Sequence, residues 1–201
     1  MIHAGAAEYY AEVSRRLATC DVVLFEGVRS PQSWLLTRSY AIATRRKRLG
    51  LVLQSDGLDY ALVKSRGVHA DVTAEQFAVT WGKAPLVQRL AMLTFAPLYG
   101  VWLFLTGTRA SIGRRMSTEE VESNKDVDFL ESMPEIQEAL LTSRDAKLVA
   151  DLSAAVENNG ADKRIAVIYG AAHMRVVSRL LTGKYRYRVV ESEWITVFGY
   201  G

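Results

Sequence analysis

The sequence predicts an α/β fold: a mixed, mainly parallel sheet flanked by helices, with an inserted apolar helical segment and an antiparallel carboxyl-terminal edge. Strand-like apolar runs alternate with helix-like patterns along the chain, which is typical of parallel sheets. The last two runs, 185–190 and 194–198, are separated by only a few residues, which favours an antiparallel pair. We expect one domain over 1–201, with the inserted helical region at about 73–132, because a chain of 201 residues suits a single domain.

In the amino-terminal half, apolar spacing and turn signals define the expected elements. Ala6 and Tyr10 begin a spacing of four and three residues that marks one face of an amphipathic helix. The Val-Val-Leu-Phe run before Glu26 is typical of a buried strand, and Thr73-x-x-Gln76 is a capping box that starts a helix. The expected order is a helix over 6–17, a strand over 22–25, a helix that begins at Pro31 and continues towards Leu51, and a helix that begins after Thr73.

In the carboxyl-terminal half, Pro134 opens a helical pattern and Asn159-Gly160 closes the next one. Ser117-x-x-Glu120 is another cap sequence, in a polar and acidic stretch that indicates an exposed connection or lid. The expected order is a helix from Pro134, an amphipathic helix from 148 to 159, a strand over 165–169, a helix over 174–181, and the strand-like runs 185–190 and 194–198.

Composition and charge narrow the class of partner. The net charge is +3, and the basic clusters at 45–48 and 114–115 are short and lack interleaved aromatic side chains, so we expect no nucleic-acid binding. Cys20 is the only cysteine, which excludes an intramolecular disulfide and a zinc site built from several cysteines. No secretory signal pattern is visible, so we expect a cytoplasmic protein, with membrane association as the alternative.

One segment is the reason to keep membrane association as an alternative. Leu90–Thr108 is an uncharged run between Arg89 and Arg109, long enough for the lower limit of a transmembrane helix but interrupted by Pro97. A single crossing would place His173 on the opposite side of the bilayer from the amino-terminal candidate site residues. We therefore favour a buried helix, a helix that forms a homodimer, or a hairpin at the membrane surface that bends at Pro97.

The candidate reactive side chains follow two predicted strands. Gly170-x-x-His173 comes after the strand over 165–169, and Glu26 comes after the strand over 22–25. The carboxyl ends of parallel strands meet at one edge of a sheet, where ligands bind. Imidazoles and carboxylates at such an edge suit a divalent metal ion or a base that activates water. A turn-capping histidine and a solvated glutamate are the structural alternatives.

The chain contains only three histidines, and each lies beside the end of a predicted element. His3 directly precedes the first helical pattern, and His69 lies in the sequence Gly-Val-His-Ala-Asp71. The set of motifs in the chain then occurs in this order: Ile2-His3 with Glu8-Tyr9-Tyr10, Leu24-Phe25-Glu26-Gly27-Val28, Gly57-Leu58-Asp59-Tyr60 with His69-Ala70-Asp71, Ser143-Arg144-Asp145, and Tyr169-Gly170-Ala171-Ala172-His173 with the tail Glu191-Ser192-Glu193-Trp194.

In this order and over almost the whole chain, the motifs resemble the TraB/PrgY/GumN family, which includes the Tiki proteins and is similar to the erythromycin-esterase and ChaN-like proteins. The resemblance implies an α/β fold in which two histidine motifs, a glutamate and an arginine face one cleft. By position, His3 and His173 are the paired histidines, Glu26 is the glutamate and Arg144 is the arginine. The family places a strand before its first histidine, so either the chain is truncated before His3 or that strand is absent.

The resemblance also implies an activity. Tiki members are described as divalent-metal-dependent proteases, and the esterase relatives use a histidine to activate water. Two imidazoles and a carboxylate, from His3, His173 and Glu26, would leave an open position on a metal ion for water. Arg144 would hold an anionic group or stabilise an oxyanion. Its structural alternative is an ion pair with Asp145 or another neighbouring acid.

We therefore expect a metal-dependent hydrolase, peptidase-like or amidase-like, with Mn, Co or Zn as the metal ion and a peptide or small molecule as substrate. Glu26, His173 and Arg144 are the expected catalytic residues, and His3, Glu26 and His173 the expected ligands. The expected accessory residues are His69, Asp71, Asp145 and Gly170. The alternative functions are a non-catalytic regulatory protein that binds a signal peptide or a metal ion, and a membrane-associated factor that works through Leu90–Thr108.

Overall fold

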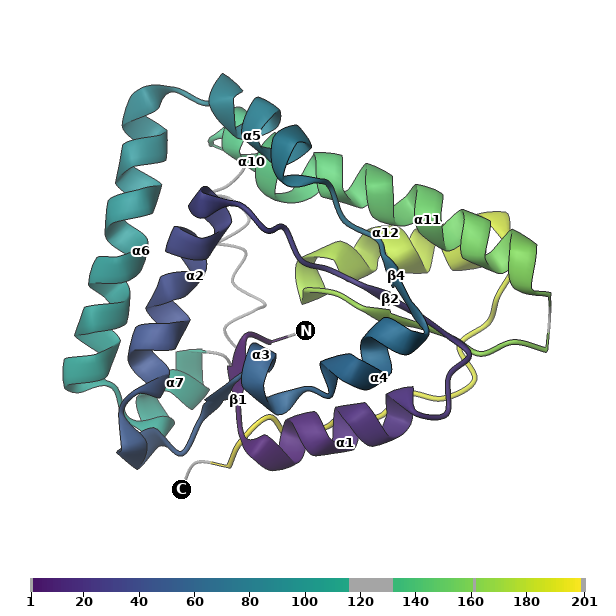
Figure 1. The fold of residues 1–201 in the computed structure, drawn as a ribbon, viewed down its shortest axis with the longest axis horizontal. Helices are drawn as coiled ribbons and strands as arrows, with labels where there is room; N and C mark the ends of the chain where they lie inside the picture. The colour runs from purple at the N-terminus through teal and green to yellow at the C-terminus, as the bar shows by residue number, and fades with distance from the viewer. Residues whose placement is uncertain (1, 116–131, 161, 200–201) are drawn as a thin grey trace.

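Three short parallel strands form the sheet at the centre of the fold (Figure 1). The computed structural model describes residues 2–115, 132–160 and 162–199. In it, β2 (Val22–Phe25) lies between β4 (Gly67–His69) and β5 (Ile165–Ile168). Phe25 is level with His69 on one side and with Ile168 on the other. The segments that follow the three strands therefore meet at one edge of the sheet.

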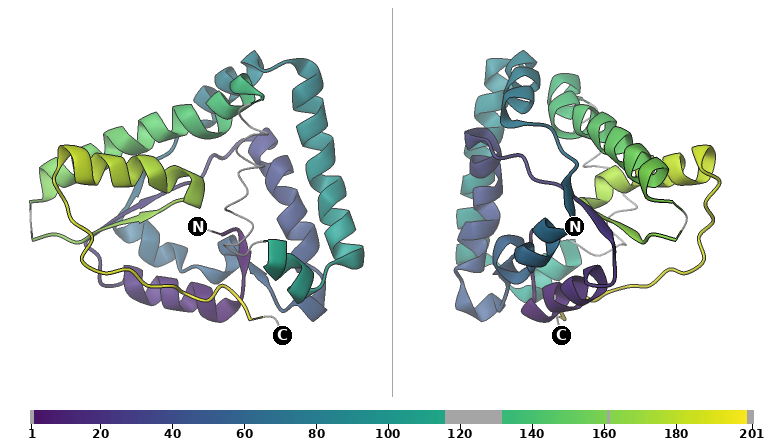
Figure 2. Two further views of the ribbon diagram at one scale, coloured as in Figure 1. Left: turned by 180° about the vertical axis from the view of Figure 1, so that it is seen from behind. Right: turned by 45° about the vertical axis from the view of Figure 1, so that its right-hand side comes forward.

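Helices cover both faces of this sheet, as the two views of Figure 2 show. One face packs against α11 (Ser143–Asn159) and α12 (Met174–Arg179), and the other against α1 (Ala7–Leu17) and α4 (Tyr60–Ser65). Successive side chains of a strand point to opposite faces, so Leu24 joins the first of these cores and Val23 joins the second. Both side chains are fully buried.

The amino-terminal residues form a second, two-stranded sheet beside the first. β1 (Ala4–Gly5) pairs antiparallel with β3 (Val52–Leu53), and α3 (Gln54–Gly57) follows directly. The backbone amide of Gln54 also donates to the carbonyl of His3 at 2.9 Å. This pairing fixes the position of His3 next to the main sheet.

The remaining helices lie to one side of the sheet. α2 (Pro31–Thr44) and α6 (Leu86–Thr106) run side by side at the left of Figure 1. Residues of α5 and α10 share a small core that includes Phe77 and Ile136. The bounds of the elements not yet given are η1 (Lys47–Leu49), α5 (Ala74–Lys83), α7 (Arg109–Arg115), α10 (Pro134–Gln137), the π-helical turn η2 (Glu138–Thr142), η3 (Ala171–His173) and the π-helical turn η4 (Leu180–Lys184).

The α/β class and the small parallel sheet flanked by helices confirm the coarse prediction, and several elements match in detail. Ser30 and Thr73 each form a capping box at the start of α2 and α5. Gly160 ends α11 with a positive φ of 70°, which glycine adopts without strain. The apolar segment forms one continuous helix through Pro97 instead of a bent hairpin. The cap sequence at 117–120 lies outside the described residues.

The predicted antiparallel carboxyl-terminal edge is wrong. Residues 185–190 and 194–198 have no regular secondary structure and pair with no described strand, and the segment runs along α1 instead (Figure 2). The amide of Ala6 donates to the carbonyl of Val197 at 2.9 Å, and Arg16 pairs with Glu193 at 2.9 Å. The β-branched and aromatic residues there have strand propensity, but propensity forms a strand only where a partner edge buries the side chains. Val190 is instead almost fully exposed.

Candidate functional site

Three charged side chains meet where β2 and β4 end and α11 begins. Arg144 binds Asp71 through two parallel hydrogen bonds, Nε to Oδ1 at 2.9 Å and Nη2 to Oδ2 at 2.7 Å. The same Nη2 donates to Oε2 of Glu26 at 3.2 Å. The exposed fractions of these side chains are 0% for Asp71, 9% for Glu26 and 16% for Arg144. The sequence-predicted pair of Glu26 and Arg144 therefore does come together, and Asp71 joins it.

Asp71 holds this cluster together through the hydrogen bonds that it accepts. Besides Arg144, its carboxylate accepts hydrogen bonds from the amides of Gly27 at 2.9 Å and Val72 at 2.8 Å. Burial by itself would raise the pKa of Asp71, but these donors outweigh burial and its pKa is lowered. Four donors occupy the acceptor positions of the carboxylate, so Asp71 positions other groups and is not available as a base.

Arg144 is held permanently charged. Burial alone would lower the pKa of its guanidinium, but the hydrogen bonds to Asp71 and the nearby Glu26 carboxylate raise the pKa instead. The π-helical turn η2 lies immediately before α11, and a π turn adds a residue that rotates every following side chain about the helix axis. Arg144 thereby reaches the sheet edge. The alternative of an ion pair between Arg144 and Asp145 is not what the structure shows.

His173 and Asp145 form a second pair, in which the histidine is buried and the aspartate is partly exposed. The imidazole Nδ1 lies 2.6 Å from Oδ1 of Asp145, and the His173 side chain is only 4% exposed. Because a carboxylate only accepts hydrogen bonds, Nδ1 carries the proton in the neutral ring and Nε2 keeps its lone pair. The exposed fraction of Asp145 is 22%, so this pair reaches the surface.

Tyr169 lies between the Glu26–Arg144–Asp71 cluster and the His173–Asp145 pair. Its ring packs edge-on against the ring of His173, with centroids 4.8 Å apart, and the guanidinium of Arg144 lies 5.6 Å from its centroid. Its hydroxyl donates to the carbonyl of Ala70 at 2.9 Å. Burial and the nearby Asp71 raise the pKa of this phenol, so it remains a donor. The sequence analysis quoted Tyr169 within a motif but assigned it no role.

Gly170 leaves the space between His173 and Glu26 open. A Cβ placed on it would lie 3.6 Å from Cδ2 of His173 and 3.9 Å from Oε2 of Glu26. The imidazole and the carboxylate thus approach the same point at the sheet edge. This position agrees with the prediction that Glu26, His173 and Arg144 converge.

His3 lies at the border of the cluster. Burial lowers the pKa of its imidazole, the negative charge of Glu26 partly offsets this, and Arg144 lowers it further. Its ring contacts Tyr40 with centroids 5.0 Å apart. The nearby Gln54 donates from its side-chain amide to the hydroxyl of Tyr60 at 3.2 Å. Gln54 was missed in the sequence, because the strand β3 that precedes it was not predicted and the helix from Pro31 was expected to continue towards Leu51.

His69 takes a different role from the other two histidines. Its Nε2 lies 2.8 Å from the carbonyl oxygen of Gly27, and its ring packs edge-on against Phe25. The residue is exposed. It therefore braces the turn that follows β2 and stands outside the Glu26–Arg144–Asp71 cluster.

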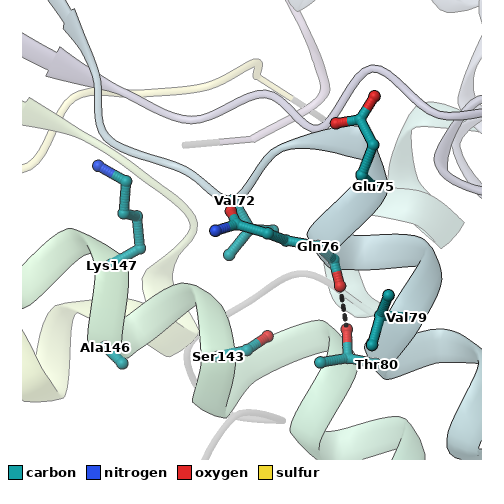
Figure 3. A pocket seen from close by; sticks show the side chains of 8 residues that line it. All are labelled: Val72, Glu75, Gln76, Val79, Thr80, Ser143, Ala146 and Lys147. Carbon is teal, nitrogen blue, oxygen red and sulfur yellow. Dashed lines mark hydrogen bonds between the residues drawn. The ribbon is translucent and has the colours of Figure 1, made fainter.

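An open apolar hollow lies beside the site, between α5 and α11 (Figure 3). Its wall includes Val72 and Ser143, the chain neighbours of Asp71 and Arg144. Glu75 and Lys147 stand at opposite sides of it (Figure 3). The segments that anchor the buried charges thus also form the walls of a surface groove.

The predicted metal ligands do not form a ligand set in this arrangement. Within 2–115, 132–160 and 162–199, no three histidine, cysteine or carboxylate side chains are grouped so as to hold a metal ion. Arg144 occupies Oε2 of Glu26, and a cation there competes with a metal ion for the same oxygen. The divalent metal ion implied by the family resemblance stays a prediction.

The fold and the site together define an α/β protein with a buried charge cluster at the carboxyl edge of a small parallel sheet. No protein-family model, curated protein or solved structure matches the chain.

Proposed function

We propose that the protein is a hydrolase of peptide, amide or ester bonds in which His173 is the general base. The observation that carries this proposal is the pair of buried His173 and partly exposed Asp145, with Nδ1 and Oδ1 2.6 Å apart, beside a fixed guanidinium. A carboxylate that accepts the Nδ1 proton orients the ring and stabilises the imidazolium that forms during catalysis. It leaves Nε2 to take a proton from water.

The proposed reaction needs one proton to be moved and returned. Water attacks the substrate carbonyl while Nε2 of His173 takes the water proton, and the imidazolium then donates that proton to the leaving nitrogen or oxygen. Arg144 supplies a positive charge for the developing oxyanion or for an anionic substrate group. Glu26 accepts from Nη2 of Arg144, the same nitrogen that donates to Asp71, and so helps to hold the guanidinium in place.

A metal-dependent version of this chemistry is a further part of the proposal. Nε2 of a histidine whose Nδ1 is bound to a carboxylate is also a common metal ligand, because the carboxylate fixes the ring and raises its basicity. His3 is favoured in its neutral form, as metal binding requires. Mn²⁺, Co²⁺ and Zn²⁺ are the ions to test.

The test is a hydrolysis screen with the purified chain. Model peptides, amides and nitrophenyl esters are incubated with and without each of these ions, and rates are compared for the wild type, His173→Asn and Asp145→Asn. We expect His173→Asn to lower the rate about 10²–10⁴-fold. His69→Gln is the matched control, because His69 is an exposed histidine beside the same sheet edge. Hydrolysis that persists in His173→Asn, or none of any substrate with any ion, contradicts the proposal.

A non-catalytic regulatory protein is the second candidate, favoured by one specific observation. Asp71, Glu26 and Arg144 bind one another inside the fold, and structural ion-pair networks do the same. In that case peptide or metal binding occurs without turnover. Isothermal titration with the ions and peptides of the screen, run on samples that show no hydrolysis, separates the two candidates.

A further inference from the structure

The helices on the far side of the molecule from the sheet carry an unusual charge pattern. We call α2, η1, α6 and α7 the α2–α6 arm. Residues 27–55 contain six Lys or Arg and residues 76–115 contain five, and neither range contains a single Asp or Glu, although the chain has 22 acidic residues. The arm is therefore a purely cationic part of a nearly neutral protein.

The arm also exposes most of an apolar helix. α6 has 21 residues, is long and apolar enough to cross a membrane, and is mostly exposed. The exposed fractions are 69% for Phe95, 63% for Leu98 and 66% for Leu105. Contiguous apolar surface of this kind on a folded chain marks a site that another surface covers.

The arm is a defined unit and not a loose helix. A Cβ placed on Gly100 would lie 2.5 Å from Cα of Ser39, so the two helix backbones are in close contact there. Arg46 donates from Nη1 to the carbonyls of Phe104 and Gly107, both at 2.9 Å, which satisfies free carbonyls at the end of α6. The carboxyl ends of α2 and α6 thus lie together, with the basic residues of η1 beside them.

α6 cannot cross a bilayer alone while the sheet is formed. β2 precedes α6 in the chain and β5 follows it, yet the two strands pair in one sheet. Arg144 and Asp71, from the two sides of α6, are likewise in contact. The apolar surface must therefore be covered from outside while the fold remains on one side.

We propose that the α2–α6 arm docks on the surface of an anionic lipid bilayer. The exposed side chains of α6 would enter the interface, where Trp102, stacked on Tyr99 with centroids 5.6 Å apart, suits the headgroup level. Lys47 and Arg48 are exposed and form no ion pair with another described residue, so they are available to acidic headgroups.

Charge favours a bilayer over a second copy of the chain as the occupant. A symmetric dimer places the same patch of each copy against the other. Two arms without acidic residues would offer only cations to each other's cations, whereas anionic headgroups provide the complementary charge. The docking site is independent of the proposed hydrolase activity, and its test does not require turnover.

The test is co-sedimentation of the full chain with vesicles of phosphatidylcholine alone and with 30% phosphatidylglycerol. We expect binding to the anionic vesicles only, and a partition about 30-fold lower or more for Lys47→Glu/Arg48→Glu, because each surface cation contributes about 5-fold. Phe95→Ser/Leu98→Ser should lower it at least about tenfold.

Matched controls come from outside the arm. Arg179→Glu/Arg188→Glu makes the same charge change at two exposed arginines, and Val189→Ser/Val190→Ser removes two apolar side chains that are 80% and 98% exposed. Both should bind like the wild type. Equal binding to both vesicle types, no binding, or arm variants that bind like the controls overturns the proposal. So does a dimer in light scattering that Phe95→Ser/Leu98→Ser converts to monomer without affecting vesicle binding.

Discussion

The sheet-edge site and the α2–α6 arm depart from ordinary protein packing in opposite directions. At the site, charged side chains are buried, and Asp71 is completely inaccessible. On the arm, large apolar side chains such as Phe95 are exposed to solvent. Buried charge and exposed apolar surface are the two informative exceptions to the rule that apolar residues lie inside.

The two regions differ in whether the buried charges of the site and the exposed apolar side chains of the arm have partners within the chain. Asp71 accepts four hydrogen bonds, two of them from the guanidinium of Arg144, so its buried charge is satisfied within the chain. Among the described residues, α6 packs mainly along α2, with Met92 and Leu93 against the core shared by α5 and α10, and most of its remaining apolar surface is exposed. We infer that contacts within the chain hold the site in place, whereas the exposed apolar face of the arm needs a binding partner outside the chain.

The largest effect should follow from removal of the shared cation at the site. Arg144→Met leaves the buried carboxylates of Asp71 and Glu26 without their shared positive partner. Breaking a buried ion pair in this way typically costs about 3–5 kcal/mol of unfolding free energy. Urea denaturation measures the loss. Lys163→Met, which breaks the exposed pair with Asp21, is the control and should leave the midpoint unchanged. Similar midpoints for both variants would show that the buried cluster does not stabilise the fold.

On the arm, the close contact of its two helices should be the most sensitive point. Gly100→Ala places a methyl group against the backbone of Ser39, and such overpacking typically costs about 1–3 kcal/mol. Gly82→Ala on α5 meets no atom within 4 Å and should instead stabilise the protein by about 0.4–1 kcal/mol. Opposite shifts in melting temperature are the expected result, and a stabilised Gly100→Ala would contradict the packing of α6 on α2.

The outer face of α6 should contribute little to stability in solution. Leu98→Ala removes a side chain that is 63% exposed, so we expect a change within about 0.5 kcal/mol. Leu148→Ala, in the core against the sheet, removes a fully buried leucine and should cost about 2–5 kcal/mol. A large loss for Leu98→Ala would mean that another part of the chain covers the arm.

The smallest effect concerns pH. Burial lowers the pKa of His3 in the folded state, so between that pKa and about 6.5 the unfolded chain binds more protons. Stability should therefore be fully retained above about pH 6.5 and decline as the pH falls through this window. Chemical denaturation of wild type and His3→Gln at several pH values measures it. An identical pH dependence in both would assign the decline to other groups.

The sequence could predict those parts of the fold that depend on local signals. The Val22–Phe25 strand, the capping box at Thr73 and the stop at Gly160 all appeared where expected. The strands expected after Tyr185 did not form, because strand formation depends on a partner edge that local sequence does not reveal.

Part of the site was also predictable from local strand signals. Glu26 and His173 follow parallel strands, and strand register alone brings them to one edge. The partners Asp71 for Arg144 and Asp145 for His173 depend on the rotation of α11 after its π-helical turn. Adjacent residues of a helix look equivalent in sequence. The sequence therefore could not show that Arg144 pairs with Asp71 and Asp145 with His173, instead of Arg144 with Asp145.

The central claim, that Asp145 orients His173 as a base, can be tested directly by NMR of the protein labelled with ¹⁵N at histidine. With only three histidines, the ring signals can be assigned with single variants. We predict that neutral His173 carries its proton on Nδ1, and that Asp145→Asn changes this protonation pattern. A neutral His173 with its proton on Nε2, unaffected by Asp145→Asn, would contradict it.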